Sequence, residues 1–315
     1  MRIGLRVVRG LALGWGLALA GAVPAAPVML APAAWRAGQT ATYAFDTKLR
    51  RSVTVTLGER SRTQQSETDI LGEIDWTVNA VRPAGGYDCT MTLTWMSVET
   101  RAGGDPTRVD SRRPAGADTR EMHGLLRAMA GTPLQVTVEP DGRVAGVDGL
   151  DAMKSKAKTP DLIPDEADFV ETASGLAALA GAPRRPLDAG ERWDAGFTWK
   201  HDLGTVDEDW TYRLEGVEPV AGVTLATVTG EARSRLHVDE QHTRAPAGAP
   251  ELTVRLVDRE TTSRVLMDVD RGEAAGRYGR TSETVRFEMK LPAGTFRREM
   301  HELTVSEVVR VAEGG

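Results

Sequence analysis

Apolar and polar residues alternate along most of this sequence, and this period of two is what most constrains the fold. In residues 70–80 the apolar side chains fall on even positions, and in residues 192–201 they fall on odd positions. Such alternation is typical of antiparallel strands with one face on a core and the other in water. Similar runs occur at residues 53–57, 134–138, 206–214, 252–256, 285–291 and 303–311.

Strands in globular proteins usually have about five or six residues, and several of these runs are longer. We therefore predict a mainly β fold (α+β), in which a long, curved antiparallel sheet or an incomplete barrel carries a few bridging helices. Tight hairpins are expected at residues 139–143 and 268–272, where a glycine supplies the positive φ that such turns need. Helical spacing of apolar residues predicts helices at 118–130 and 165–180.

These elements divide the chain into a leader at residues 1–26 and an exported β-rich domain at 27–315. Within this domain we distinguish a β half at 35–148, a helical connector at 149–185 and a second β half at 186–315.

The two β halves share short sequence similarities. Ala37-Gly38-Gln39 resembles Ala189-Gly190-Glu191, and Asp75-Trp76-Thr77 recurs as Asp209-Trp210-Thr211. The two matches lie at different offsets along the chain. Either a duplication that made two related halves or the ordinary sequence preferences of hairpins accounts for the likeness.

Residues 1–26 have the pattern of a secretory signal peptide. Arginines at positions 2, 6 and 9 precede an apolar run at 11–22, and cleavage is expected after Ala22 or Ala25. The alternative is a membrane anchor, but the run is shorter than the roughly 20 residues that a spanning helix needs. No cysteine follows the run, so a lipoprotein anchor is not expected. We expect a periplasmic or secreted protein with no membrane span after cleavage.

The charge balance and the single cysteine limit the possible partners and chemistry. The chain has a net charge of −6, and removal of the three leader arginines makes it −9. An acidic chain without a basic block argues against nucleic acid as a partner. Cys89 stands alone, so no internal disulfide can form. It is either a reactive thiol or a small hydrophobe on the inner face of a strand, and its apolar phase favours the second.

No catalytic motif is present, so we predict no enzymatic activity and no cofactor. The densest polar cluster holds His237, Asp239 and His242, which are weak candidates for a metal site. Positions five apart on a strand point to opposite faces, which favours a solvated strand end. A hydrolase whose site is assembled only in space, from His201, His237 or His242 and carboxylates, remains an alternative.

Five tryptophans carry the most functional potential, because all lie in the apolar phase of expected strands. In a sheet that curves into an incomplete barrel, these rings would line a concavity that holds an acyl chain, a lipid or another apolar molecule. The alternative is a filled core to which they only add buried area. We favour a non-enzymatic binder or carrier of a hydrophobic ligand in the cell envelope, with a structural or protein-interaction module as the alternative. The tentative lining residues are Trp76, Trp95, Trp193, Trp199 and Trp210.

Two stretches carry a family resemblance. Residues 125–144 combine Leu125-Leu126 with Gly131-Thr132-Pro133 and the hairpin at 139–143, and residues 186–193 read Pro-Leu-Asp-Ala-Gly-Glu-Arg-Trp. Together with the leader, they resemble an uncharacterised family of exported bacterial proteins, domain-of-unknown-function family 6263, over most of the mature chain. The resemblance implies no known activity and no catalytic residues. By architecture the pattern is also similar to the half-barrels of periplasmic lipoprotein carriers, which is an analogy of fold only.

Overall fold

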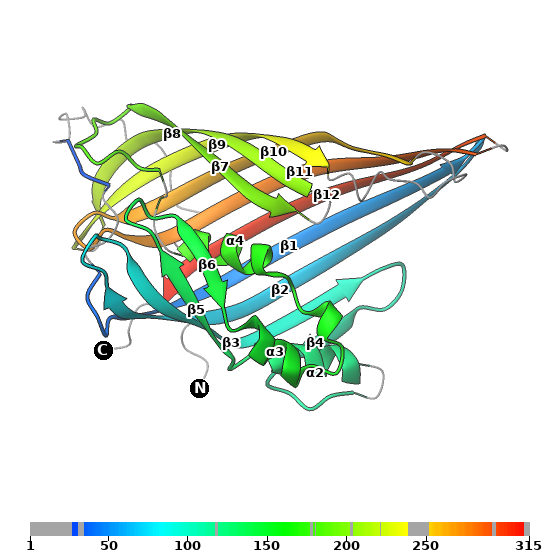
Figure 1. Ribbon diagram of the computed structural model, residues 1–315, viewed down its shortest axis with the longest axis horizontal. Coiled ribbons are helices and arrows are strands. Elements are labelled where there is room, and N and C mark those ends of the chain that lie inside the picture. The colour runs from blue at the N-terminus through cyan, green and yellow to red at the C-terminus, as the bar shows by residue number, and fades with distance from the viewer. Residues whose placement is uncertain are drawn as a thin grey trace.

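The computed structural model describes residues 27–30, 35–116, 119–176, 179, 181–201, 204–220, 222–238, 252–291 and 294–311. Within these ranges the chain forms one antiparallel sheet of twelve strands with three short α-helices and one 3-10 turn (Figure 1). The predicted fold class, a long curved sheet with few helices, is confirmed. The expected leader at 1–26 lies outside the described residues.

The strands vary from four to twenty-two residues in length. They are β1 (Thr40–Leu57), β2 (Arg60–Val81), β3 (Tyr87–Arg101), β4 (Thr107–Asp110), β5 (Pro133–Val138), β6 (Val144–Asp148), β7 (Arg192–His201), β8 (Gly204–Val220), β9 (Val223–Val238), β10 (Leu252–Asp268), β11 (Glu273–Leu291) and β12 (Gly294–Val311). The helices are α2 (Arg120–Met129), α3 (Leu150–Lys156) and α4 (Glu166–Leu176), with the 3-10 turn η1 at Pro160–Leu162.

Pairing between the first and last strands makes the two β halves a single sheet. The strand order is β6-β5-β3-β2-β1-β12-β11-β10-β9-β8-β7, and β4 pairs with β3 beside this path. The β1–β12 ladder runs from the pair Thr42–Val311 to the pair Leu57–Phe296. In the described part of the chain β6 and β7 do not pair, so the sheet stays open. The helical connector therefore joins the two edges of one sheet, and α4 contacts both β6 and β7.

The sheet is curved, and its edges turn toward the same side (Figure 1). Irregular register at Thr94 of β3, Asn79 of β2, Val257 of β10 and Ala275 of β11 marks β-bulges, which bend strands and increase their twist. The helices lie on the inner side of this bend, which we call the concave face; the opposite side is the convex face.

Two separate cores fill the flanks of the concave face. The first packs β1, β2, β3, β5 and β6 against the helices, with Trp76, Tyr43 and Leu134 among its buried residues. The second packs strands β7 to β11 around Trp210, Leu214 and other apolar residues. Cys89 is fully buried in the first core, as predicted, and burial raises the pKa of its thiol to about 12. It is therefore a packed hydrophobe rather than a reactive thiolate.

The two β halves start with the same local structure. Gly38 and Gly190 have positive φ angles of 83° and 87°, which favour glycine. The Gly38 N–H donates to the Val78 carbonyl, and the Gly190 N–H donates to the Leu214 carbonyl. A β-bulge directly follows both Val78 and Leu214. The likeness between the halves therefore extends from sequence to hydrogen bonding.

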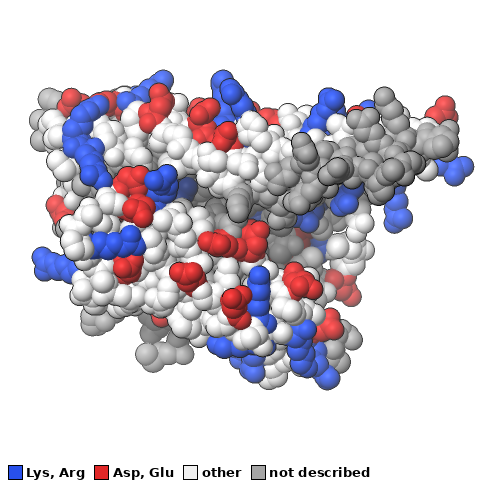
Figure 2. Space-filling view, in the orientation of Figure 1, with Lys and Arg blue, Asp and Glu red and all other residues white. Residues whose placement is uncertain are grey.

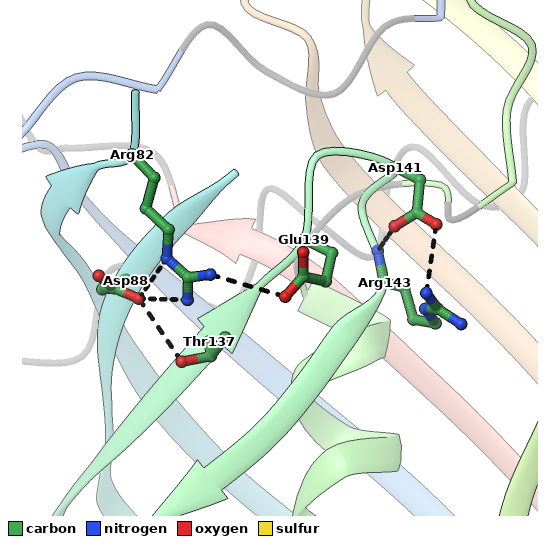
Figure 3. Close-up of polar contacts among 6 residues, drawn as sticks. All are labelled: Arg82, Asp88, Thr137, Glu139, Asp141 and Arg143. Atoms are coloured by element: carbon green, nitrogen blue, oxygen red, sulfur yellow. Dashed lines mark hydrogen bonds and ion pairs between the residues drawn. The ribbon is translucent and has the colours of Figure 1, made fainter. Parts of the chain in front are cut away.

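Both predicted hairpins are present, and the first is tied to a neighbouring turn (Figure 3). The Gly142 N–H donates to the Glu139 carbonyl at 2.9 Å, and the Gly272 N–H donates to the Asp268 carbonyl at 2.7 Å. Beyond the end of β2, Arg82 donates to Asp88 at 2.6 Å and lies 3.6 Å from the Glu139 carboxylate. This arginine therefore links the β2–β3 hairpin to the β5–β6 hairpin.

A buried ion pair joins three distant parts of the chain where β1 begins. Glu273 is fully buried, and its carboxylate accepts hydrogen bonds from Gln39 and from Arg310 on β12. Burial raises the pKa of Glu273, against the lowering effect of the Arg310 charge. The Glu273 carboxyl group therefore binds its proton more tightly in the folded protein than in the unfolded chain.

In the middle of β2, an aromatic ring from β1 packs over a glycine. Gly72 lies directly opposite Phe45 on β1. A Cβ atom at Gly72 would lie 2.5 Å from Phe45 Cζ and 2.6 Å from the Trp95 carbonyl oxygen. The Phe45 ring thus occupies the space of the missing side chain, as aromatic residues do over sheet glycines.

We expect Gly72→Ala to lower the free energy of unfolding by roughly 1–3 kcal/mol, because the methyl group overpacks against a ring and a backbone oxygen. The matched control is Gly196→Ala on β7, where a Cβ would meet nothing within 4 Å. The control should be neutral or slightly stabilising, since alanine reduces the entropy of the unfolded chain. Urea denaturation of the three proteins measures the effect, and equal midpoints for both variants would contradict it.

Glu273 should make stability depend on pH in a defined direction. Above the ordinary carboxyl range and up to the raised pKa, the folded state binds a proton that the unfolded chain has released, so the free energy of unfolding falls as pH rises. In Glu273→Gln the amide does not titrate, so the part of the decrease in unfolding free energy that Glu273 causes should be absent. The measurement is urea unfolding of both proteins over a pH series; parallel curves at every pH would refute the assignment.

Candidate ligand-binding face

The middle of the concave face is a floor of small residues. Thr47, Ser306, Gly279, Ser263 and Gly230 lie directly opposite one another on the successive strands β1, β12, β11, β10 and β9. A second row adds further small side chains at Thr304, Thr281, Thr261 and Ala232. Because these side chains are short, they do not fill the space between the two flanks. Figure 2 shows the surface hollowed between the β7–β8 flank and the flank that carries the helices.

Stacked aromatic rings from β7 and β8 border the small-residue floor on one side and form what we call the aromatic wall. Tyr212 lies opposite Gly230, and a Cβ there would be 2.7 Å from its ring, so the ring covers the glycine. The Trp210 ring stacks on the Tyr212 ring, with ring centres 5.2 Å apart and an interplanar angle of 6°. The Trp193 ring also stacks on Tyr212, with ring centres 5.5 Å apart and an interplanar angle of 25°. Burial raises the pKa of Tyr212 to about 12, while Arg277 lowers it and Glu208 raises it.

A row of paired charges crosses the concave face next to the floor. Arg51, Glu302, Glu283 and Arg259 occupy one register row on β1, β12, β11 and β10. Arg51 lies 2.6 Å from Glu302, and Arg259 lies 2.5 Å from Glu283 and 3.3 Å from Glu208 on β8. Partly buried charges are tolerated where they are paired in this way. We call these five residues the charge row.

Neighbouring aromatic side chains support the charge row. The Arg259 guanidinium lies 4.7 Å from the centre of the Trp199 ring, and the Trp210 indole N–H donates to Glu208 at 3.1 Å. The Ser234 hydroxyl also donates to Glu208, at 3.1 Å. Sequence reasoning missed this row because its members come from five strands. The only sequence signal for the charge row is a charged residue in the inward phase of each strand. In β10 the bulge at Val257 shifts this phase, so the alternation does not predict that Arg259 points inward.

Beyond the charge row, toward the β1–β2 and β11–β12 turns, the concave face becomes apolar. Leu57 is 47% exposed and Val55 is 36% exposed. Arg298 interrupts the apolar rows, and its guanidinium lies 5.8 Å from the centre of the Phe287 ring. Val53, Val55, Leu57, Phe287, Met289, Phe296 and Met300 share this face in register and form what we call the distal apolar patch.

The five predicted tryptophans do not gather in one cavity. Trp76 is fully buried in the first core, and Trp193 and Trp210 are buried in the second. Trp199 is half-buried beside the charge row. Trp95 lies on the convex face, because the bulge at Thr94 places it opposite Glu73 instead of in phase with Trp76. The Arg112 guanidinium covers its ring at 3.7 Å.

The candidate metal ligands are only partly within the described residues. His237 lies on the convex face, where its Nε2 is 3.0 Å from an Asp207 oxygen. Asp239, His242 and the side chain of His201 lie outside the described residues. Among the residues described, no group of three or more histidine, cysteine, aspartate or glutamate side chains is placed to hold a metal ion.

A separate hollow of about 360 Å³ lies on the helix-bearing flank. Its walls come from β3, β4 and the start of α2, and they include Val98, Val109, Thr119 and Met122. None of the five tryptophans lines it. In the described part of the chain, no helix combines the length and apolar character needed to cross a bilayer.

Comparison with known proteins finds remote structural similarity. No curated protein matches this chain. Lipovitellin, in a structure titled for its lipid–protein interactions, aligns with a TM-score of 0.42 and 10% identity over 89% of this chain and 26% of that one. This chain thus spans about a quarter of the lipovitellin chain, 26% of its length.

Two bacterial proteins give lower scores. An outer membrane channel from Pseudomonas putida F1 aligns with a TM-score of 0.23 and 11% identity over 88% of this chain and 97% of that one. A putative outer membrane lipoprotein-sorting protein domain from Vibrio parahaemolyticus aligns with a TM-score of 0.14 and 9% identity over 86% of this chain and 87% of that one. Similarity at this level says nothing about function.

The family comparison is more specific. The matched segment begins in the β2–β3 turn and ends within α4, so it includes β3, the β5–β6 hairpin and the helices of the first core up to the middle of α4. The motif at 186–193, which also carried the sequence resemblance, lies outside it. Residues 84–171 match the model of DUF6263, a family of unknown function, and the resemblance predicted from the sequence is confirmed over this segment.

Proposed function

We propose that this protein is a non-catalytic binder of an apolar or amphipathic small molecule, which it holds on the concave face of its sheet. The observation that carries the proposal is the distal apolar patch. It presents seven apolar side chains from three adjacent strands, and two of them are more than a third exposed. Contiguous exposed apolar surface of this kind marks a place that another molecule covers.

The apolar character belongs to one face of these strands. On the convex face of the same strands, Arg286 pairs with Glu299 at 2.7 Å, and Arg297 pairs with Glu288 at 2.7 Å. Thr54 bonds to Thr63 across β1 and β2 at 2.9 Å. A surface that faces only water has no need for this asymmetry. The difference between the faces therefore supports an apolar ligand on the concave side.

A small molecule fits this face better than a protein partner does, because the patch continues along the same strands from the hollow between the two flanks. Each methylene group that moves from water onto such a surface contributes about 0.8 kcal/mol. An acyl chain laid along the strands would therefore gain enough free energy to bind. The alternative, an envelope protein that docks on the same patch, is an outcome that the experiment below separates.

The test places two charges in the patch. Val55→Asp with Leu57→Asp should weaken binding of a dansyl-labelled long-chain fatty acid about tenfold or more, because an acyl chain would then bury carboxylates. The control is Thr54→Asp with Thr56→Asp, which adds the same charges to the same strand on the convex face. Binding is followed by dansyl fluorescence. Equal affinity in both double variants, or no binding to the unaltered protein, would overturn the proposal.

We also propose that the protein works in the cell envelope, on the evidence of the leader. Expression of the full chain in a bacterium with a periplasm should yield protein that starts at Val23 or Ala26. Mass spectrometry of the purified protein identifies that end. Recovery of the chain with Met1 intact from the cytoplasmic fraction would contradict export.

A further inference from the structure

Arg277 is a cation on the concave face that pairs with no carboxylate among the described residues. It lies opposite Val308 on β12 and Val265 on β10, so its neighbours in the register row are apolar. The side chain is half-buried and takes part in no ion pair within the described part of the chain. By contrast, Arg51, Arg259 and Arg310 on the same face all have carboxylate partners. A guanidinium remains charged at any physiological pH, so Arg277 is a permanent positive charge in partly dehydrated surroundings.

A second unpaired polar group lies beside it. Ser263 is only 6% exposed, and its buried Oγ has no hydrogen-bond partner in the part of the chain that the structure describes. This oxygen points over the small-residue floor, since a Cβ at Gly230 would lie 3.0 Å from it. Ser263 is opposite Gly279, two residues from Arg277 on the same face. Diagonal neighbours of this kind are about 7–8 Å apart, within reach of an arginine side chain.

Glycines lie on both sides of Ser263 in the register row. Gly230 precedes it and Gly279 follows it in the register row, so no side chain from β9 or β11 covers the floor at this point. The Tyr212 ring borders the floor from the β8 side. A half-buried cation and a buried hydroxyl without a partner among the described residues therefore lie close together on the concave face.

We propose that the ligand of this protein is an anionic amphiphile, whose carboxylate or phosphate headgroup pairs with Arg277 and accepts a hydrogen bond from the Ser263 hydroxyl. This inference rests on the proposed function and names the chemical class of its ligand. Charge-assisted hydrogen bonds to a guanidinium are strong, and low local dielectric strengthens them. Arg51, Arg259 and Arg310 are already paired with carboxylates. The other inward arginines, Arg60, Arg62 and Arg298, are exposed at the distal end of the face, whereas Arg277 is half-buried beside the floor, which favours Arg277 as the headgroup partner. The apolar part of the ligand then remains on the concave face.

The direction of the strands suits such a ligand. Arg277 and Val285 lie on the same face of β11, eight positions apart. At a rise of about 3.3 Å per residue, this separation is roughly 26 Å. The distal apolar patch begins at the row of Val285, so an amphiphile that pairs with Arg277 and also contacts the patch must span at least this distance along β11 and cross the charge row.

The test compares a dansyl-labelled long-chain fatty acid with its methyl ester, which has the same chain but no charge. The unaltered protein should bind the acid roughly tenfold or more tightly than the ester. Arg277→Gln should lower the affinity for the acid to that for the ester and leave the ester unchanged. The control, Arg280→Gln, removes the same charge from the convex face of the same strand and should alter neither affinity.

Two further measurements check that the Arg277→Gln variant folds and which headgroup the protein prefers. Arg277 has no ion pair with any described residue, so the urea midpoint of Arg277→Gln should equal or exceed that of the unaltered protein. Displacement of the probe by an alkyl phosphate and by a fatty acid of equal chain length tells the two headgroups apart, and preference for either over the alkyl alcohol supports the proposal.

The outcomes separate the two proposals. If the unaltered protein binds acid and ester equally well, the anionic headgroup is refuted while an apolar ligand stands. If it binds neither, the proposed function itself fails.

Discussion

The ladder between β1 and β12 is the interaction on which the rest of the structure depends. It pairs the first strand with the last over sixteen register positions, from Thr42–Val311 to Leu57–Phe296. Without it, the chain would consist of two separate sheets, each with an exposed edge at the centre of the present molecule. Closing so long a loop costs conformational entropy before any contact compensates it. The buried contacts of Glu273 with Arg310 and Gln39 lie at one end of this ladder and hold the same three regions together.

Because the sheet is continuous but open, its inner side has a middle that neither core fills. The first core occupies the flank under the helices, and the second occupies the flank at β7 and β8. Between them the register places short side chains, then a row of paired charges, then apolar residues, in that order along the strands. A core meant only for stability would be apolar and tightly packed throughout. This graded surface is the basis for our proposal that the concave face binds a ligand.

Much of the fold was predictable, because strand alternation and turn glycines are local signals. The hairpin at 139–143 forms at Gly142, and Cys89 is buried as its apolar phase indicated. The site was less predictable. The bulge at Thr94 moves Trp95 to the convex face, and nothing in the alternation around it reveals the extra residue. Arg277 and Ser263 are ordinary polar residues in sequence, and only the pairing of β10 with β11 brings them to one place.

By itself, the sequence determined that the chain forms long antiparallel strands with few helices, and that one face of each strand is apolar, because side-chain direction follows position along a strand. The tertiary structure decided that the two halves share one sheet, since the pairing of β1 with β12 depends on contacts between opposite ends of the chain. It also decided which inward residues fill a core and which remain available to a ligand. That division follows from curvature and bulges, which set how closely the two flanks approach each other, and no local pattern of residues encodes that distance.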